Sequence, residues 1–134
     1  MTLLEEVRTF LNAIGSLGTI KIGTMPETPD AVCCLYEYGG KDPVGRFGVT
    51  GIGYENPAIQ VVFRGDPEDY IAPRVKADTA WKALAAFQPG ALGSGVTTVY
   101  LTIQPKQSPF LLEPGDRNKR IKIACNFYIM KEPS

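Results

Sequence analysis

Two strand-like runs flank a long glycine-rich stretch, and this arrangement constrains the fold more than any other feature of the chain. The runs cover residues 31–38 and 57–64, and the stretch between them covers residues 39–54. The stretch is too long for a tight hairpin turn. A loop of this length in a small domain usually carries the function or is ordered by a partner. The sequence therefore predicts a long functional loop between two sheet strands.

Length and composition indicate one ordinary globular domain over residues 1–134. The chain is 44% hydrophobic, which is enough to build a core without disulfides or structural metals. Fourteen acidic side chains balance fourteen basic ones, so no overall field attracts the chain to DNA or to an anionic membrane, although local basic patches remain open. The acidic N-terminal segment is unlike a signal peptide, and no apolar run approaches the roughly 20 residues that span a bilayer. We expect a soluble protein, made inside the cell, with no membrane partner.

The absence of histidine narrows the possible chemistry. It removes the commonest general base and metal ligand, together with every Ser-His or Cys-His nucleophile arrangement. The chain also contains no P-loop, no dinucleotide-binding glycine pattern after a strand and no carboxylates at metal-ligand spacing. No CxxC pair is formed by Cys33, Cys34 and Cys125. We expect them to be buried thiols rather than a disulfide or a zinc site. We therefore expect no catalytic residues, no cofactor and no metal.

Hydrophobic periodicity predicts the order helix, short strand, long strand, loop, strand, helix, strand, strand. The predicted helices begin at a Thr2 capping box and near Ala72, and they end at Gly15 and at Pro89-Gly90. Pro73 is expected to kink a helix that begins earlier. The strands not yet named are predicted at residues 19–22, 96–104 and 120–131.

These elements define an α+β fold class. We expect an antiparallel or mixed sheet of about four to five strands with two helices packed on one face. The other face is then left for solvent or a partner. Exposed edge strands of such a sheet can pair with a neighbouring subunit.

Four short segments, taken in this order and spacing, resemble one family. They are Met25-Pro26…Pro29-Asp30, Leu35-Tyr36-Glu37-Tyr38-Gly39-Gly40, Tyr54-Glu55-Asn56-Pro57…Gln60-Val61 and Gln107-Ser108-Pro109-Phe110. Over most of its length the chain is similar to small minor capsid proteins of tailed bacteriophages, in particular the tail terminator, or head–tail joining, proteins. A head–tail adaptor or neck protein is the nearest variant.

The resemblance implies a structural protein without catalytic residues. Such proteins have an α+β fold and assemble as a hexameric ring that caps the tail tube and meets the head connector. The implied mechanism is stoichiometric: the ring stops tail polymerisation and presents a docking surface to the head. The implied partners are further copies of the chain, the tail tube protein and the head connector or stopper proteins. The implied location is the neck or tail of the virion, after assembly in the host cytoplasm.

The resemblance also implies that the extended segment from Lys41 to Gly53 touches the tail tube or an adjacent subunit. Apolar and cationic side chains of the kind that interfaces favour occur in and beside this segment. The candidate interface residues are Lys41, Arg46, Phe47, Val49, Ile52 and Tyr54. The alternative reading is a mobile surface loop without a partner.

A second candidate site is the densest basic cluster of the chain, which could meet DNA passing through a ring lumen. It consists of Arg117, Lys119, Arg120 and Lys122. Because Asp116 and a turn lie beside it, an ordinary solvated hairpin is the alternative.

Two other classes of protein stay open at the level of sequence. A small enzyme would need two carboxylates, for instance Glu37 and Asp42, held in one cleft with separated pKa values. A ligand-binding module of the same α+β shape would need an apolar pocket with a few polar groups. Such a module would work as a monomer or dimer, so the oligomeric state distinguishes it from a ring-forming protein.

Overall fold

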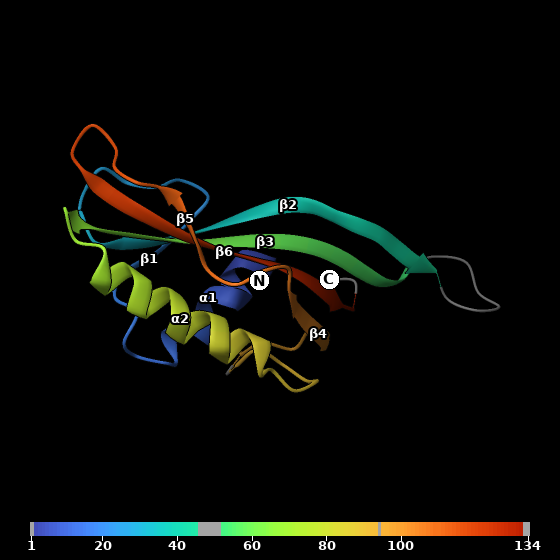
Figure 1. Ribbon diagram of the computed structural model, residues 1–134. Coiled ribbons are helices and arrows are strands. Elements are labelled where there is room, and N and C mark those ends of the chain that lie inside the picture. Colours follow the sequence, from blue (N-terminus) through green and yellow to red (C-terminus); the bar gives the residue numbers. More distant parts are fainter. Residues whose placement is uncertain (1, 46–51, 94, 133–134) are drawn as a thin grey trace.

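A layer of two helices packs on one face of a mixed sheet, as the ribbon in Figure 1 shows. The structure is a computed structural model that describes residues 2–45, 52–93 and 95–132. Its elements are α1 (Leu3–Asn12), β1 (Ile20–Ile22), β2 (Val32–Gly45), β3 (Ile52–Pro67), α2 (Ile71–Ala85), β4 (Tyr100–Pro105), β5 (Phe110–Glu113) and β6 (Arg120–Lys131). The expected α+β class and helix–strand order are confirmed. No helix in the described part of the chain is long and apolar enough to cross a membrane.

The sheet is open and has six strands in the described residues, in the order β1-β2-β3-β6-β4 with β5 also on β6. Only β1 and β2 run parallel, and every other pairing is antiparallel. Strands β4 and β5 share one edge of β6, with Ile103 opposite Ile129 and Phe110 opposite Ala124. Strand β5 was not predicted from the sequence. Its four residues lie between two turn-rich segments and are too few to show a clear alternation of apolar and polar side chains.

Helix α1 begins at the predicted capping box. The Glu5 backbone N–H donates to Thr2 Oγ1 at 3.4 Å, and the Thr2 N–H donates to Glu5 Oε1 at 3.0 Å. Two N–H groups that the first turn leaves unpaired are thereby satisfied.

Helix α2 begins beside the predicted acidic cap region. Asp69 Oδ1 accepts a hydrogen bond from the Ala72 N–H at 3.2 Å. Pro73 lies in the first turn, where its missing N–H would have no partner within the helix in any case. The helix starts at Ile71, within one residue of the predicted start near Ala72, and it runs through Pro73 to Ala85.

Both helices contribute to one hydrophobic core, which confirms that they lie on the same face of the sheet. The two helices lie on the same side of the sheet (Figure 1), and their buried residues belong to the same cluster as buried residues of the central strands. The buried cluster includes Leu3, Val7 and Leu11 of α1, Ala77, Ala80 and Leu84 of α2, and Leu35, Val61, Phe63, Ile123 and Phe127 of the sheet. Trp81 is partly buried against this core, and its Nε1–H donates to the Gln107 carbonyl at 3.0 Å.

A buried polar contact joins the helix layer to β4. The Tyr100 hydroxyl donates to Glu6 Oε1 at 2.9 Å, and both side chains are almost fully buried. Phe87 packs edge-on against Tyr100 and against Phe10. Burial and the neighbouring Glu6 raise the pKa of the Tyr100 hydroxyl, so this group stays protonated and keeps donating.

The glycine-rich stretch differs from the predicted loop. Strand β2 continues to Gly45 and β3 begins at Ile52, so much of the predicted 39–54 loop is paired strand. Only residues 46–51, which lie outside the described part, connect the two strands. Glycines weaken a strand pattern in sequence, but the backbone pairing of two long strands continues regardless of side-chain type.

Candidate functional site

The β2–β3 hairpin extends beyond the rest of the sheet and forms an arm, visible on the right of Figure 1. Strand β6 follows β3 only as far as the pair Glu55 and Lys131. Beyond that point, in the part of the chain that the structure describes, β2 and β3 pair only with each other, with Val44 opposite Tyr54 and Gly45 opposite Ile52. We refer to residues 41–45 and 52–56 as the arm; its base, at Glu55 and Asn56, still lies beside β6.

An irregularity in β2 sets the arm apart from the sheet. The register shifts between Tyr38 and Lys41, so the strand carries a bulge there. Gly40 adopts a φ of 71° within the bulge, and a Cβ at this position would collide with the carbonyl oxygen of Asn56. Only glycine lets the two backbones approach this closely at positive φ.

The arm brings together some of the residues that the sequence singled out as an interface. Lys41 is exposed on β2, Tyr54 is 38% exposed on β3, and Ile52 is the first residue of β3. Arg46, Phe47 and Val49 lie outside the described residues. The proposed acid pair of an enzyme is not assembled in what is described: Glu37 is exposed, and the placement of the Asp42 side chain falls outside the description.

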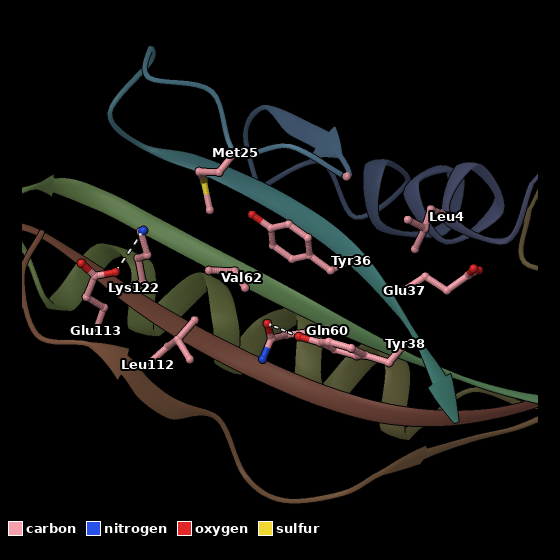
Figure 2. Close-up of a pocket in the computed structure, with 11 residues that line it drawn as sticks. Leu4, Met25, Tyr36, Glu37, Tyr38, Gln60, Val62, Leu112, Glu113 and Lys122 are labelled. Carbon is pink, nitrogen blue, oxygen red and sulfur yellow. Dashed lines mark hydrogen bonds and ion pairs between the residues drawn. The ribbon is translucent and has the colours of Figure 1, made fainter. Parts of the chain in front are cut away.

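The sheet face opposite the helices is hollowed into an open groove of about 520 Å³, shown in Figure 2. Tyr36 and Tyr38 of β2 and Gln60 and Val62 of β3 form its floor, and Leu112 of β5 stands at its border. Tyr38 donates its hydroxyl hydrogen to Gln60 Oε1 at 2.7 Å. The open face that the sequence predicted is therefore a concave surface with aromatic and aliphatic lining.

Burial changes the chemistry of one tyrosine in this groove. It raises the pKa of Tyr36 to about 12, with a smaller contribution from the thiol of Cys34, two residues earlier in β2. Tyr36 therefore stays a neutral hydroxyl at physiological pH and can donate a hydrogen bond to a partner. The sequence identified Tyr36 and Tyr38 as sharing one strand face, and both line this groove.

A second cluster on the open face combines two lysines and a tyrosine near the base of the arm. Lys41 Nζ and Lys106 Nζ lie 4.5 Å and 4.8 Å from the centre of the Tyr128 ring. Both distances are within the range of a cation–π interaction. Lys106 and Tyr128 were not among the predicted site residues, because three distant segments meet here only after the sheet has formed.

The predicted basic cluster does not form one exposed cationic patch. Arg120 is buried and binds Asp116 at 2.8 Å, Glu27 at 3.2 Å and Asp30 at 3.2 Å. Lys122 pairs with Glu113 at 3.1 Å on the border of the groove (Figure 2).

The other two members of the cluster are exposed. Arg117 lies 3.9 Å from Glu27, and Lys119 lies 3.5 Å from Glu68. Their side chains are 85% and 74% exposed, so these ion pairs are weak and both cations remain accessible.

Arg120 belongs to a network that fastens the Met25–Asp30 link to the end of the sheet. Asp116 accepts the Asn118 N–H at 2.8 Å, the Arg120 N–H at 3.0 Å and Arg120 Nε–H at 2.9 Å. These donors hold the pKa of Asp116 far below its usual range, so the carboxylate stays ionised.

Arg64, the second arginine of this network, was not among the residues predicted from the sequence. Its Nε donates to the Asp30 carbonyl at 2.8 Å, and its Nη2 lies 2.6 Å from the Pro26 carbonyl and 2.8 Å from that of Pro29. The available signal was its position, because Arg64 directly follows the apolar run of a predicted strand.

The three cysteines are free and buried, as expected. Burial raises the pKa of the Cys125 thiol to about 12 and moves that of Cys33 in the same direction. Among the described residues no group of three or more His, Cys, Asp or Glu side chains is placed to hold a metal ion.

Comparison with known proteins gives two findings. Residues 10–132 match the family model described as "Bacteriophage tail terminator protein". The structure is similar to a chain of the "Virion of native gene transfer agent (GTA) particle", with a TM-score of 0.67 over 98% of this chain and 95% of that chain. Sequence identity is 17%, so this second similarity shows the fold alone. No curated protein matches the sequence.

Proposed function

Because the chain belongs to the bacteriophage tail terminator family, we propose that it ends tail polymerisation by covering the last ring of the tail tube and then joins the tail to the head. The observation that carries this proposal is the family match over residues 10–132, which includes every element from the latter part of α1 to β6. A structural role in the phage tail and at its junction with the head follows from the family. Capping of the tail tube and formation of a ring are what we propose beyond that role.

The proposed working form is a hexameric ring. A ring is the closed form of a repeated contact between two different surfaces of the same subunit. The chain offers different surfaces at the two ends of its sheet: the arm at one end, and the β3–α2 turn beside the Met25–Asp30 link at the other (Figure 1). These surfaces support the proposal because they are not self-complementary copies of one patch.

The arm is the proposed contact with the tail tube or with an adjacent subunit. It extends past the sheet, and a two-stranded extension without further partners is poorly stabilised by its own chain. Docking would provide the missing contacts. Lys41, Ile52 and Tyr54 of the arm, with Arg46, Phe47 and Val49 between its strands, are the proposed contact residues.

DNA in the ring lumen is a second proposed partner, and the exposed members of the basic cluster are the candidates for it. Arg117 and Lys119 are mostly exposed, whereas Arg120 and Lys122 are engaged with acids. We therefore assign any contact with DNA to Arg117 and Lys119. The proposed partners remain the tail tube protein and the head connector or stopper proteins, and the proposed location is the neck of the virion.

Shortening the arm tests this function. Replacing residues 45–53 with Asn-Gly would close the pair Val44 and Tyr54 with a two-residue turn and leave the sheet intact. We expect a folded protein that no longer joins heads to terminator-deficient tails in a mixing assay. Lys82→Ala, on an exposed part of α2, serves as the control and should join normally. Full joining by the shortened chain would contradict the role of the arm, and failure of the wild-type chain to join would contradict the function itself.

A further inference from the structure

No ion pair with a carboxylate is found for the cluster of Lys41, Lys106 and Tyr128 among the described residues. Both lysines are exposed. Two ammonium groups that lie within 5 Å of the centre of one ring give this place a local positive charge. An anion placed beside them would be attracted by both charges. We call these three residues the lysine site.

A buried acceptor lies next to the lysine site. Lys106, Asn126 and Tyr128 border a pocket of about 240 Å³ on the open face of the sheet. The Asn126 side-chain oxygen is buried there and has no hydrogen-bond partner in the described chain. An unpaired buried acceptor requires a donor. A polypeptide with an acidic side chain supplies an anion and N–H donors together, whereas a phosphodiester backbone supplies only the anion.

The same chain carries an exposed acidic segment at the end of β3 and in the turn that leads to α2. Asp66 and Glu68 are both exposed. Glu68 lies in the turn itself, where its backbone has a φ of 63°. In the described residues the only ion pair of these two acids joins Glu68 to Lys119, with both side chains more than 70% exposed. Such exposed pairs contribute little, so the turn can exchange this contact for another. We call Asp66 and Glu68 the acidic turn.

The acidic turn cannot reach the lysine site of its own chain. Lys41 is opposite Asn56 on β3, and Asp66 lies ten residues further along the same strand. At about 3.3 Å per residue the two surfaces are roughly 33 Å apart. They lie at opposite ends of the sheet (Figure 1).

We propose that the acidic turn of one copy docks on the lysine site of the next copy. The inference rests on the proposed ring and names the two surfaces that build it. One surface is basic and the other is acidic, so the two are complementary in charge. Because the two differ, the contact is heterologous and repeats from copy to copy, as a ring requires.

Two charge-reversal variants test the contact by native mass spectrometry and sedimentation. The first, Lys41→Glu/Lys106→Glu, has two acidic surfaces, and the second, Asp66→Lys/Glu68→Lys, has two basic surfaces. Like charges then meet in each pure sample, and we expect half-assembly to need about a hundredfold more protein. An equal mixture restores opposite charges at every contact. It should assemble into rings in which the two variants alternate in equal numbers, visible from their mass.

The control for charge alone is Lys21→Glu/Lys82→Glu, which changes the net charge by the same amount at two exposed lysines elsewhere. It should assemble like the wild-type chain. Assembly of the wild-type chain should also weaken as salt screens the contact. Circular dichroism and thermal melting show whether each variant is folded, so that a folding defect is not mistaken for a lost contact.

Three results would overturn the inference. They are normal assembly of both variants alone, failure of their mixture to assemble although each is folded, and a wild-type chain that stays monomeric at every concentration. If rings persist while binding to DNA or to tail tubes is lost, the lysine site has a different occupant and the inference is also wrong. In each of these cases the head–tail mixing assay reports separately whether the proposed function stands.

Discussion

Arg64 and Arg120, on the neighbouring strands β3 and β6, share one acceptor: the backbone carbonyl of Glu27 lies 3.4 Å from Arg64 Nη2 and 2.8 Å from Arg120 Nη1. The proline-rich link from Met25 to Asp30 has few donors of its own. Its carbonyl groups are instead satisfied by two guanidinium groups that the sheet places side by side. This network fixes the end of the sheet from which the acidic turn emerges.

Replacing Arg64 with lysine should destabilise the protein. A single ammonium group cannot reach the carbonyls that the planar guanidinium bridges, so buried acceptors lose their donors. We expect the free energy of unfolding to fall by about 2 kcal/mol in urea titrations. The control Arg117→Lys changes a side chain that is 85% exposed and should have almost no effect. Equal stability of both variants would contradict the structural role of Arg64.

Asp116 should make stability depend on pH in the acidic range. Its folded-state pKa is depressed below the ordinary value of 3.8, so its contribution is fully present above that value. The contribution is lost as the pH falls below about 4, because the unfolded chain then takes up a proton that the folded chain still excludes. We expect the difference in unfolding free energy between the wild-type chain and Asp116→Asn to shrink from pH 5 to pH 2. A difference that is independent of pH would contradict this account.

Gly40 and Gly39 offer a matched test of the bulge at the base of the arm. Alanine at position 40 would need a positive φ and would collide with the Asn56 carbonyl, whereas alanine at position 39 would meet open space. We expect Gly40→Ala to cost at least about 1–2 kcal/mol in unfolding free energy and to speed amide exchange in the arm. Gly39→Ala should change neither measurement appreciably. Similar behaviour of the two variants would show that the backbones do not approach as described.

The buried pair of Glu6 and Tyr100 should be sensitive to loss of a single oxygen atom. In Tyr100→Phe the Glu6 carboxylate loses its donor inside the core, which should cost about 1–3 kcal/mol in unfolding free energy. Tyr70→Phe, at a position that is 46% exposed, is the control and should change stability by less than about 0.5 kcal/mol. A neutral Tyr100→Phe would show that the contact does not contribute.

The three thiols should be unreactive in the folded protein. With a pKa of about 12, the Cys125 thiol is ionised at pH 8 in on the order of one molecule in ten thousand, and only the thiolate is nucleophilic. Cys33 and Cys34 are equally inaccessible. We expect slow reaction with a thiol reagent at pH 8 and rapid reaction in denaturant, with the exposed Ser16→Cys as a positive control. Fast labelling of the native wild-type chain would contradict the burial.

The local pattern of the sequence was enough to predict most of the elements. The capping box of α1, the apolar side of each helix, the alternation in β6 and the burial of the cysteines all depend on neighbouring residues, and the structure confirms them. The four short segments also identified the family, which the match over residues 10–132 confirms. The extent of β2 and β3 was underestimated, because glycines hide strand pairing that the backbone alone maintains.

The surfaces, in contrast, were decided only by the tertiary structure. Arg120 looked like one of four equivalent cations, but its position beside Asp116, Glu27 and Asp30 makes it a buried structural group. Lys41, Lys106 and Tyr128 are unremarkable when taken separately, and they form a cluster because β2, β6 and the segment after β4 bring them together. Local conformation could be predicted from the sequence because it depends mainly on residues that are close together in the chain. Whether a charge is free, paired or facing a like charge depends on residues far away in the chain, and only the folded sheet places them.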